Sequence, residues 1–292
     1  MKPPAFEYVV VASTEEAVAQ LAAHGDDARI LAGGQSLMPI LNMRLATPGR
    51  LVDLNRVGTL SYIVERPGGV AIGAMTRQRT AERSELVATA VPLLAEALPW
   101  VGHTAIRNRG TIGGSLAHAD PAAELPAVAV CLDARFTVRG EAGERTLAAR
   151  EFFRGYLTTA LAPTELLTEV WFPSALPGSG AAWIEFARRH GDYALVGVAV
   201  VVTLEGPTVR RASLAVIGVD GVPVRVVDAD GNVRASGVSD DHGAFTIDVA
   251  PGAYLLTAVI GEDPARSVKP VRVEVRAGEV VRSNVTVDSG IR

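Results

Sequence analysis

Two double-glycine segments are the residues of this sequence whose types and spacing best suit ligand binding. The first runs Ala32-Gly33-Gly34-Gln35-Ser36 and the second Thr111-Ile112-Gly113-Gly114-Ser115. Glycine lets the backbone adopt positive φ and approach a ligand closely. Successive N–H groups in such a turn form a concavity that binds anions without a lysine. One glycine pair is more often a simple turn, but two pairs beside small hydroxyl residues predict a diphosphate held from two sides.

The composition of the chain limits the kinds of protein it can be. With 292 residues, 48% hydrophobic and 21% charged, it can bury large cores in two or three domains. The formal net charge is -4, and no basic stripe interleaved with aromatic residues points to nucleic acid. No apolar run reaches the roughly 18–20 residues that a membrane span needs. The first residues lack the pattern of a secretory signal, so we expect a cytoplasmic protein.

Cysteine is too scarce for some kinds of site. The one cysteine, Cys131, lies in the apolar run 128–132, which predicts a small buried side chain. A single cysteine cannot hold a structural zinc ion or an iron–sulfur cluster. If electrons pass through iron–sulfur centres, we expect those centres on another polypeptide.

The first glycine segment is expected at the edge of a small α/β unit, residues 1–56. The hydrophobic pattern predicts three strands, at 6–11, 28–31 and 51–54. Ser13 followed by Glu15 and Glu16 has the pattern of a helix N-cap with an acidic first turn. The glycine segment directly follows the second strand, and ligands usually bind at the carboxyl ends of strands in such units.

The second glycine segment is expected in a loop of a second unit, residues 57–176. A strand pair is predicted around Pro67-Gly68-Gly69, followed by a largely helical stretch from Thr80 to Trp100. Residues 103–114 are rich in glycine and arginine, and we interpret them as the loop that carries the glycine pair. The patterns after this loop predict further elements, at 122–132, 135–139 and 166–172.

The pattern becomes entirely β-like after residue 176. Three strands are predicted between residues 177 and 219, and short strands follow to residue 292. These last strands recur about every 8–12 residues between Gly/Pro turns, which is typical of a sandwich. We therefore expect residues 220–292 to form a separate β-sandwich.

Three motifs occur together and in this order, at 32–39, 108–121 and 189–194. As a set they resemble the FAD-binding medium subunits of molybdenum hydroxylases, such as aerobic carbon monoxide dehydrogenase and the xanthine dehydrogenase flavoprotein. The resemblance covers about residues 1–225. It implies an α+β fold of the PCMH type with two FAD-binding subdomains and a truncated third, at 1–56, 57–176 and 177–219.

The C-terminal stretch 220–292 is similar to another family. Gly221-Val222-Pro223-Val224 and the segment 239–245 resemble carboxypeptidase-regulatory-like or transthyretin-like β-sandwiches. The flavoprotein relatives continue instead into a mainly helical end. The resemblance implies an interaction or spacer module rather than a second enzyme.

The flavoprotein resemblance also implies a set of FAD-binding residues. Both glycine segments would bind the diphosphate through backbone N–H groups, assisted by the hydroxyls of Ser36, Thr111 and Ser115. Gln35 stands where some flavoproteins of this broader fold attach FAD through histidine, so FAD is expected to be non-covalent. The implied site comprises Ala32, Gly33, Gly34, Gln35, Ser36, Thr111, Ile112, Gly113, Gly114, Ser115, Glu124 and Tyr193.

Several of these polar residues have a second interpretation. Glu124 would accept hydrogen bonds from ribose hydroxyls, but an acid at a helix start explains it equally well. Tyr193 would pack near the isoalloxazine ring, or it would be an ordinary core tyrosine. Arg107 and Arg109 would meet phosphate or form salt bridges.

No metal site is expected. His103 and His118 lack metal-ligand spacing. The acids near the C-terminus fit turns better than a calcium loop, at Asp228, Asp230, Asp240 and Asp241.

The resemblance implies an electron-transferring subunit without catalytic residues of its own. A large partner subunit would hold molybdopterin, and a small one two [2Fe-2S] clusters. FAD would receive their electrons and pass them to an external acceptor. The alternatives are a stand-alone FAD-dependent oxidoreductase and a scaffold protein with a vestigial flavin domain.

Overall fold

A computed structural model describes the fold. It describes residues 2–206 and 208–218 with their side chains. Beyond residue 218 it describes the backbone of six strands, β14 (Pro223–Asp228), β15 (Val233–Val238), β16 (Gly252–Ala258), β17 (Ser267–Val268), β18 (Val271–Val275) and β19 (Val287–Asp288). The expected turns around residues 230 and 240 and the expected strand at 245–249 lie outside the described residues.

The N-terminal unit is a parallel three-stranded sheet with one covering helix. The strand order is β1–β3–β2, with bounds β1 (Glu7–Val10), β2 (Ala28–Leu31) and β3 (Arg50–Asp53). Helix α1 (Thr14–His24) begins where predicted, because the Ser13 hydroxyl accepts from the Glu16 N–H at 3.1 Å. The first glycine segment leads from β2 into α2 (Leu37–Asn42), at the carboxyl edge of the sheet.

The second unit contains an antiparallel five-stranded sheet in the order β4–β5–β10–β6–β7. Its strands are β4 (Ile63–Arg66), β5 (Gly69–Gly73), β6 (Arg135–Gly140), β7 (Gly143–Ala148) and β10 (Leu166–Pro173). The predicted strand pair at Pro67-Gly68-Gly69 is confirmed. A small ribbon, β8 (Phe153–Gly155) and β9 (Thr158–Thr159), follows helix α9 (Ala149–Phe152).

The predicted helical stretch from Thr80 to Trp100 is divided into short helices. They are α3 (Gln78–Glu82), α4 (Glu85–Ala90), α5 (Pro92–Ala97) and a final 3-10 turn at Leu98–Trp100. Ser84 caps α4 by accepting from the Val87 N–H at 3.3 Å. Pro92 opens α5, where its missing N–H costs nothing. Local capping residues therefore outweigh the continuous apolar pattern.

The second glycine pair lies in a helix, whereas we expected a loop. Residues 103–114 include α6 (Thr104–Arg107) and the first turn of α7 (Ile112–His118). The reason is Thr111, whose hydroxyl accepts from the Gly114 N–H at 3.0 Å and caps α7. The apolar segment that follows forms α8 (Glu124–Cys131), whose residues are all buried.

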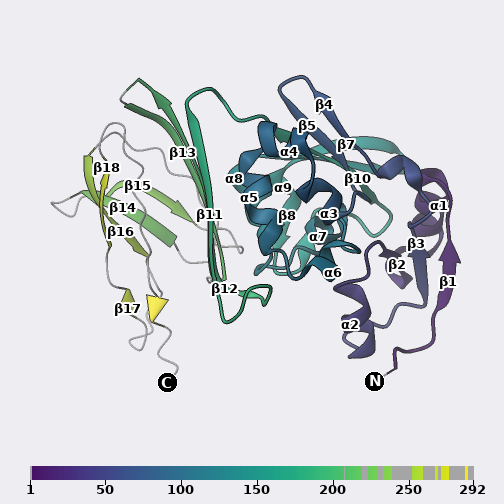
Figure 1. Ribbon diagram of the computed structural model, residues 1–292. Coiled ribbons are helices and arrows are strands. Elements are labelled where there is room, and N and C mark those ends of the chain that lie inside the picture. Colours follow the sequence, from purple (N-terminus) through teal and green to yellow (C-terminus); the bar gives the residue numbers. More distant parts are fainter. Residues whose placement is uncertain are drawn as a thin grey trace.

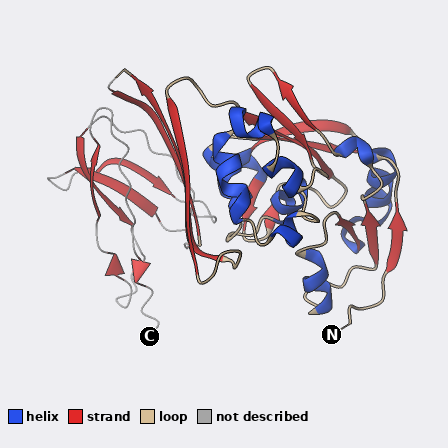
Figure 2. Cartoon of the chain, viewed as in Figure 1, coloured by secondary structure: helices blue, strands red, loops and turns tan. Residues whose placement is uncertain are grey.

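A third sheet closes the core from the other side. Strands β11 (Ser179–Ala187), β12 (Ala194–Glu205) and β13 (Thr208–Ile217) are antiparallel. Figure 2 shows the helices grouped between this sheet and the five-stranded sheet. One apolar core includes residues of both sheets and of α5, α7 and α8. Cys131 is buried in it, as predicted.

The C-terminal strands are all β, as the sequence indicates. The order β15–β14–β16–β18 makes an antiparallel sheet, and β17 pairs with β19. In Figure 1 this sheet lies on the side of β11–β13 that is away from α5 and α8. Among the described residues, no helix is long and apolar enough to cross a membrane.

Candidate functional site

The first glycine loop, residues 32–36, presents backbone donors that the protein does not use. Within the described part of the chain, no hydrogen bond engages the N–H groups of Gly33, Gly34, Gln35 or Ser36. The loop carbonyls are engaged, since Gly34 and Ser36 accept from the N–H groups of Met38 and Ile40 at 3.1 and 3.3 Å. Gly34 has a φ of +73°, a conformation that favours glycine. This loop therefore has the donor set that an anion requires.

The two glycine segments lie against each other. A Cβ on Gly33 would collide with the carbonyl oxygen of Arg109 and would lie 2.8 Å from the Gly110 Cα. A Cβ on Gly114 would lie 3.4 Å from the Cβ of Ala32. The structure therefore brings together the two segments that the sequence places about eighty residues apart, and glycine makes this approach possible.

The backbone N–H groups of the second glycine segment already donate to acceptors of the protein. The N–H groups of Ile112 and Gly113 donate to the Thr76 and Ala74 carbonyls, each at 2.9 Å. Those of Gly114 and Ser115 both donate to Thr111, to its hydroxyl at 3.0 Å and its carbonyl at 3.2 Å. The sequence predicted a diphosphate on these donors, and in the structure they have protein partners instead. They form the capped start of α7 and attach it to the 74–76 segment that follows β5, so a backbone role toward FAD stays a prediction.

Two serine hydroxyls complete the polar surface of the two segments. Neither Ser36 nor Ser115 makes a side-chain hydrogen bond to any residue that the structure describes, and both side chains are half-buried. The Thr111 hydroxyl is occupied as the cap of α7. Of the three hydroxyls in the two glycine segments, two are thus open to a ligand.

The arginines near the second segment have different roles. Arg107 is buried and donates to both carboxylate oxygens of Glu82, at 2.8 and 3.3 Å, and to the carbonyls of Val101 and Gly102. It is therefore a structural ion pair rather than a phosphate ligand. Arg109 is exposed at the junction of the two segments. Burial lowers the pKa of Arg77, and the nearby charge of Arg109 lowers it further.

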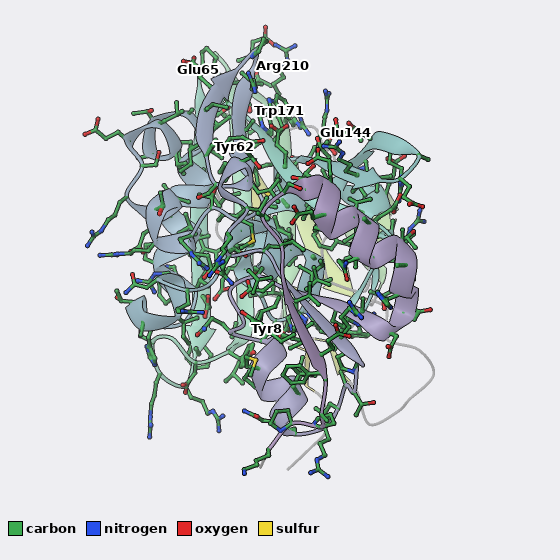
Figure 3. All side chains as sticks on the ribbon, turned by 90° about the vertical axis from the view of Figure 1, so that its right-hand side faces the viewer. Tyr8, Tyr62, Glu65, Glu144, Trp171 and Arg210 are labelled. Atoms are coloured by element: carbon green, nitrogen blue, oxygen red, sulfur yellow. The ribbon has the colours of Figure 1, made fainter. Side chains whose placement is uncertain are left out.

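A polar network lies at the carboxyl edge of the parallel sheet, beside the first loop. Tyr8 on β1 donates its hydroxyl proton to the buried Asp53 carboxylate at the end of β3. Burial alone would raise the pKa of Asp53, but hydrogen bonds from Tyr8 and Asn55 outweigh it and lower the pKa. Figure 3 shows Tyr8 well away from Tyr62 and Trp171, which belong to the second unit. Asp53 is thus a fixed negative charge near Arg109.

Glu124 is buried at the start of α8, among other acids. Burial, and to a smaller extent the nearby carboxyls of Glu185 and Asp120, raises its pKa to about 8. Glu185 on β11 is also buried, and its pKa is raised by burial. One Glu185 oxygen accepts from the Trp183 indole at 3.3 Å, and the other has no partner among the described residues. Glu124 is therefore largely protonated near neutral pH, which was not expected from the sequence.

Tyr193 lies near Glu124 and Asp120, and 70% of its surface is exposed. Partial desolvation of its hydroxyl, together with Asp120 and Glu124, raises its pKa. It is not the ordinary core tyrosine that was the alternative interpretation. The segment before it is fixed by Gly191, where φ is +89° and a Cβ would collide with the His103 ring. A neighbouring contact stacks His190 on Trp100, with centroids 5.1 Å apart.

The histidines of the second unit show no metal-site geometry. His103 packs under Gly191, and among the described residues no group of three or more His, Cys, Asp or Glu could hold a metal ion.

Sequence reasoning missed Asn55, Arg77 and Glu185. Asn55 follows a parallel strand, and polar residues at that edge are a recognisable signal. Arg77 gave no signal, because its partners lie far away in the sequence, and Glu185 gave none, because its neighbour Glu124 also lies far away in the sequence.

Two family models match this chain, and together they cover most of the described residues. Residues 4–175 match the family described as FAD binding domain in molybdopterin dehydrogenase. Residues 181–237 match the CO dehydrogenase flavoprotein C-terminal domain.

Curated relatives match over most of their length. The chain is 45% identical to the 6-hydroxypseudooxynicotine dehydrogenase complex subunit alpha of Paenarthrobacter nicotinovorans, over 92% of this chain and 88% of that one. It is 40% identical to the carbon monoxide dehydrogenase medium chain of Hydrogenophaga pseudoflava, over 77% and 78%.

A solved structure of carbon monoxide dehydrogenase from Hydrogenophaga pseudoflava has the same fold, with a TM-score of 0.74. It is 41% identical over 75% of this chain and 77% of that chain. These findings confirm the predicted fold class. Several of these matches extend past residue 220, so the boundary of a separate C-terminal sandwich stays a prediction.

Proposed function

Since this chain belongs to the family of FAD-binding medium subunits of molybdenum hydroxylases, we propose that its two glycine segments are the two sides of its FAD site. The proposal rests on one observation: four consecutive N–H groups of the first loop have no partner among the described residues. They lie beside the second segment, next to Ser36 and Ser115. Bound there, FAD supplies the redox chemistry that this chain's own side chains lack.

The charges around the first loop support this position for the diphosphate. Arg109 is close enough to Arg77 to disfavour the positive charge of Arg77, in addition to the effect of burial. Asp53 offsets them only in part, since its carboxylate is already engaged by Tyr8 and Asn55. A bound diphosphate would relieve the repulsion between the two guanidinium groups. Gln35 carries no nucleophilic nitrogen, which supports non-covalent attachment.

We assign Glu124 and Tyr193 to the far side of the same site. Glu124 lies near the Tyr193 hydroxyl, since its charge contributes to the raised pKa of Tyr193. A ribose hydroxyl that donates to Glu124 would stabilise its ionised form and lower its raised pKa. FAD binding at neutral pH would then release part of a proton from Glu124. The exposed ring of Tyr193 is available to pack on the isoalloxazine.

The redox partners lie outside this chain. Its lone cysteine is buried, and burial raises the pKa of that thiol to about 12, so Cys131 is an inert core residue. We propose that a small subunit with two [2Fe-2S] clusters delivers electrons and that a large molybdopterin subunit oxidises the substrate. The primary substrate is therefore selected by the large subunit.

The domain boundaries and the location in the cell are also proposals. We assign residues 1–56 and 57–176 to the two FAD-binding subdomains and 177–219 to the partial third one. Residues 220–292 would be the added β-sandwich, for which the all-β strand pairing gives support. A cytoplasmic location stays a prediction that cell fractionation tests.

An absorbance spectrum tests the proposed function. The purified chain, or the chain after incubation with excess FAD, should show the flavin bands and release FAD on denaturation. Co-purification from the native cell should yield an iron–sulfur subunit and a molybdopterin subunit. A chain that stays colourless with excess FAD contradicts the proposal.

Gly34→Val locates the flavin at the first loop. At φ +73° a β-branched residue is strained, and its Cβ would lie 3.2 Å from Leu31 and 3.3 Å from Met38. We expect FAD binding to be lost. Gly180→Val is the matched control, because that glycine lies in β11 with nothing within 4 Å of a new Cβ.

A further inference from the structure

Two polar side chains outside the glycine segments connect the first segment to Arg109, which lies just before the second segment. The Asn55 side-chain amide donates to the Ala32 carbonyl at 3.1 Å. Arg77 donates one N–H to the Asn55 side-chain oxygen at 2.6 Å and another to the Arg109 carbonyl. The bridge from Ala32 through Asn55 and Arg77 to Arg109 thus spans both sides of the proposed site.

The bridge sets the direction of a backbone donor. In a planar trans peptide the C=O of one residue and the N–H of the next point in opposite directions. Asn55 holds the Ala32 carbonyl on one side, so the Gly33 N–H points to the other. Gln35 acts in the same way on the next peptide, because its amide donates to the Gly33 carbonyl at 3.2 Å and so directs the Gly34 N–H.

Arg77 determines which way the Asn55 amide faces. A guanidinium group has only donors, so the atom it contacts must be the Asn55 oxygen. The Asn55 nitrogen is then left to donate to Ala32 and to Asp53. The Asn55 backbone N–H also donates to Asp53, at 2.7 Å. Asn55 therefore has one orientation, fixed from three sides.

The first loop packs on a peptide that hydrogen bonds hold in place, just before the second segment. The Arg109–Gly110 peptide is held at both ends, since its oxygen accepts from Arg77 and its N–H donates to Ile106 at 2.7 Å. Gly33 packs directly against this peptide. A change in the Asn55–Arg77 bridge would therefore rotate the first loop and leave the second segment in place.

We propose that Asn55 and Arg77 are positioning residues that aim the Gly33 N–H at the FAD diphosphate. The inference rests on the proposed function. Neither side chain belongs to the apolar core, and Asn55 is exposed. The bridge thus orients donors and contributes little to folding.

The test begins with Asn55→Leu, which has a similar volume and can neither donate nor accept. We expect FAD to bind about tenfold more weakly, with the urea midpoint of the FAD-free protein unchanged. Asn42→Leu is the matched control, a half-buried asparagine of α2 whose side chain makes no hydrogen bond to the described residues. It should bind FAD as the wild type does.

A double-mutant cycle and a spectrum separate positioning from general disruption. Arg77→Lys keeps the charge but cannot span both acceptors, so it should weaken FAD binding severalfold in the wild type and have no effect beside Asn55→Leu. At saturating FAD, the phosphorus NMR signals of the bound diphosphate should shift in Asn55→Leu and not in Asn42→Leu.

The outcomes separate the two claims. A wild-type chain that binds no FAD overturns the proposed function and the inference together. Normal FAD binding by the wild type, with unchanged affinity and phosphorus signals in Asn55→Leu, overturns the inference alone. Additive effects of the two substitutions would likewise contradict the bridge.

Discussion

The two glycine segments have nearly the same composition but different roles in the structure. The first leaves four N–H groups open, and side-chain amides hold its carbonyls at Ala32 and Gly33. The second uses the N–H groups of residues 112–115 to cap α7 and to attach it to the 74–76 segment. A glycine pair thus indicates close backbone approach, but only the count of donors tells whether a ligand or the protein itself is approached.

The largest loss of stability is expected from a substitution at Gly113. Its Cβ would lie 2.7 Å from the Ala74 Cα and 2.8 Å from the Ala74 oxygen, and these backbone atoms cannot move aside. We expect Gly113→Ala to lower the free energy of unfolding by about 3 kcal/mol in the absence of FAD, measured by urea denaturation. Gly58→Ala is the control, since its Cβ would meet nothing within 4 Å. A stable Gly113→Ala protein that merely loses FAD would remove the distinction between the segments.

Glu124, just after the second segment, should also behave as a buried structural group when FAD is absent. Its folded pKa, about 8, lies above the ordinary glutamate value of 4.5, so its ionisation opposes folding as the pH rises between these values. Glu124→Gln should match the wild type below about pH 4 and be more stable by roughly 1–4 kcal/mol at pH 9. Glu85→Gln, at the exposed start of α4, is the control. Equal pH profiles for wild type and Glu124→Gln would show that Glu124 ionises normally.

Thr111 should affect stability before it affects the ligand. Its hydroxyl caps α7 through the Gly114 N–H at 3.0 Å. Thr111→Ala should therefore cost about 1 kcal/mol of unfolding free energy, and up to about 2. Thermal or urea unfolding of the FAD-free protein measures it. An unchanged midpoint would mean that the hydroxyl is free for a phosphate, as in the first loop.

Ser36 should show the opposite behaviour with the smallest effect on stability. It precedes α2 without a capping hydrogen bond. Ser36→Ala should change the unfolding free energy by less than about 0.5 kcal/mol and weaken FAD binding by roughly 3- to 10-fold. Fluorescence titration with FAD measures the affinity. Loss of stability without loss of affinity would place Ser36 with Thr111.

The sequence predicted the elements around the site better than the use of each donor. The strands and the capped helix of the first unit follow from local signals such as Ser13, and they are observed. Thr111 is likewise a residue type that caps helices, but we interpreted its surroundings as a loop, since two glycines disfavour a helix. The structure keeps that helix because packing against Ala74 requires glycine at position 113.

Other parts of the site could not be predicted from local pattern. The raised pKa of Glu124 comes first from burial in the folded core and then from the carboxyl of Glu185, a residue of the third sheet. The assignment of Arg107 to Glu82 depends on the packing of α6 against α3. The bridge through Asn55 and Arg77 joins the N-terminal unit to the second unit. Each of these contacts is made between residues that fold together only in the tertiary structure.

Amide hydrogen exchange tests the difference between the two segments most directly. In the FAD-free protein, the amides of residues 112–115 should exchange slowly and those of residues 33–36 quickly, since only the former are hydrogen-bonded. Adding FAD should slow exchange at 33–36 and change 112–115 little. Fast exchange at both segments without FAD, followed by equal protection at both with FAD, would contradict the account.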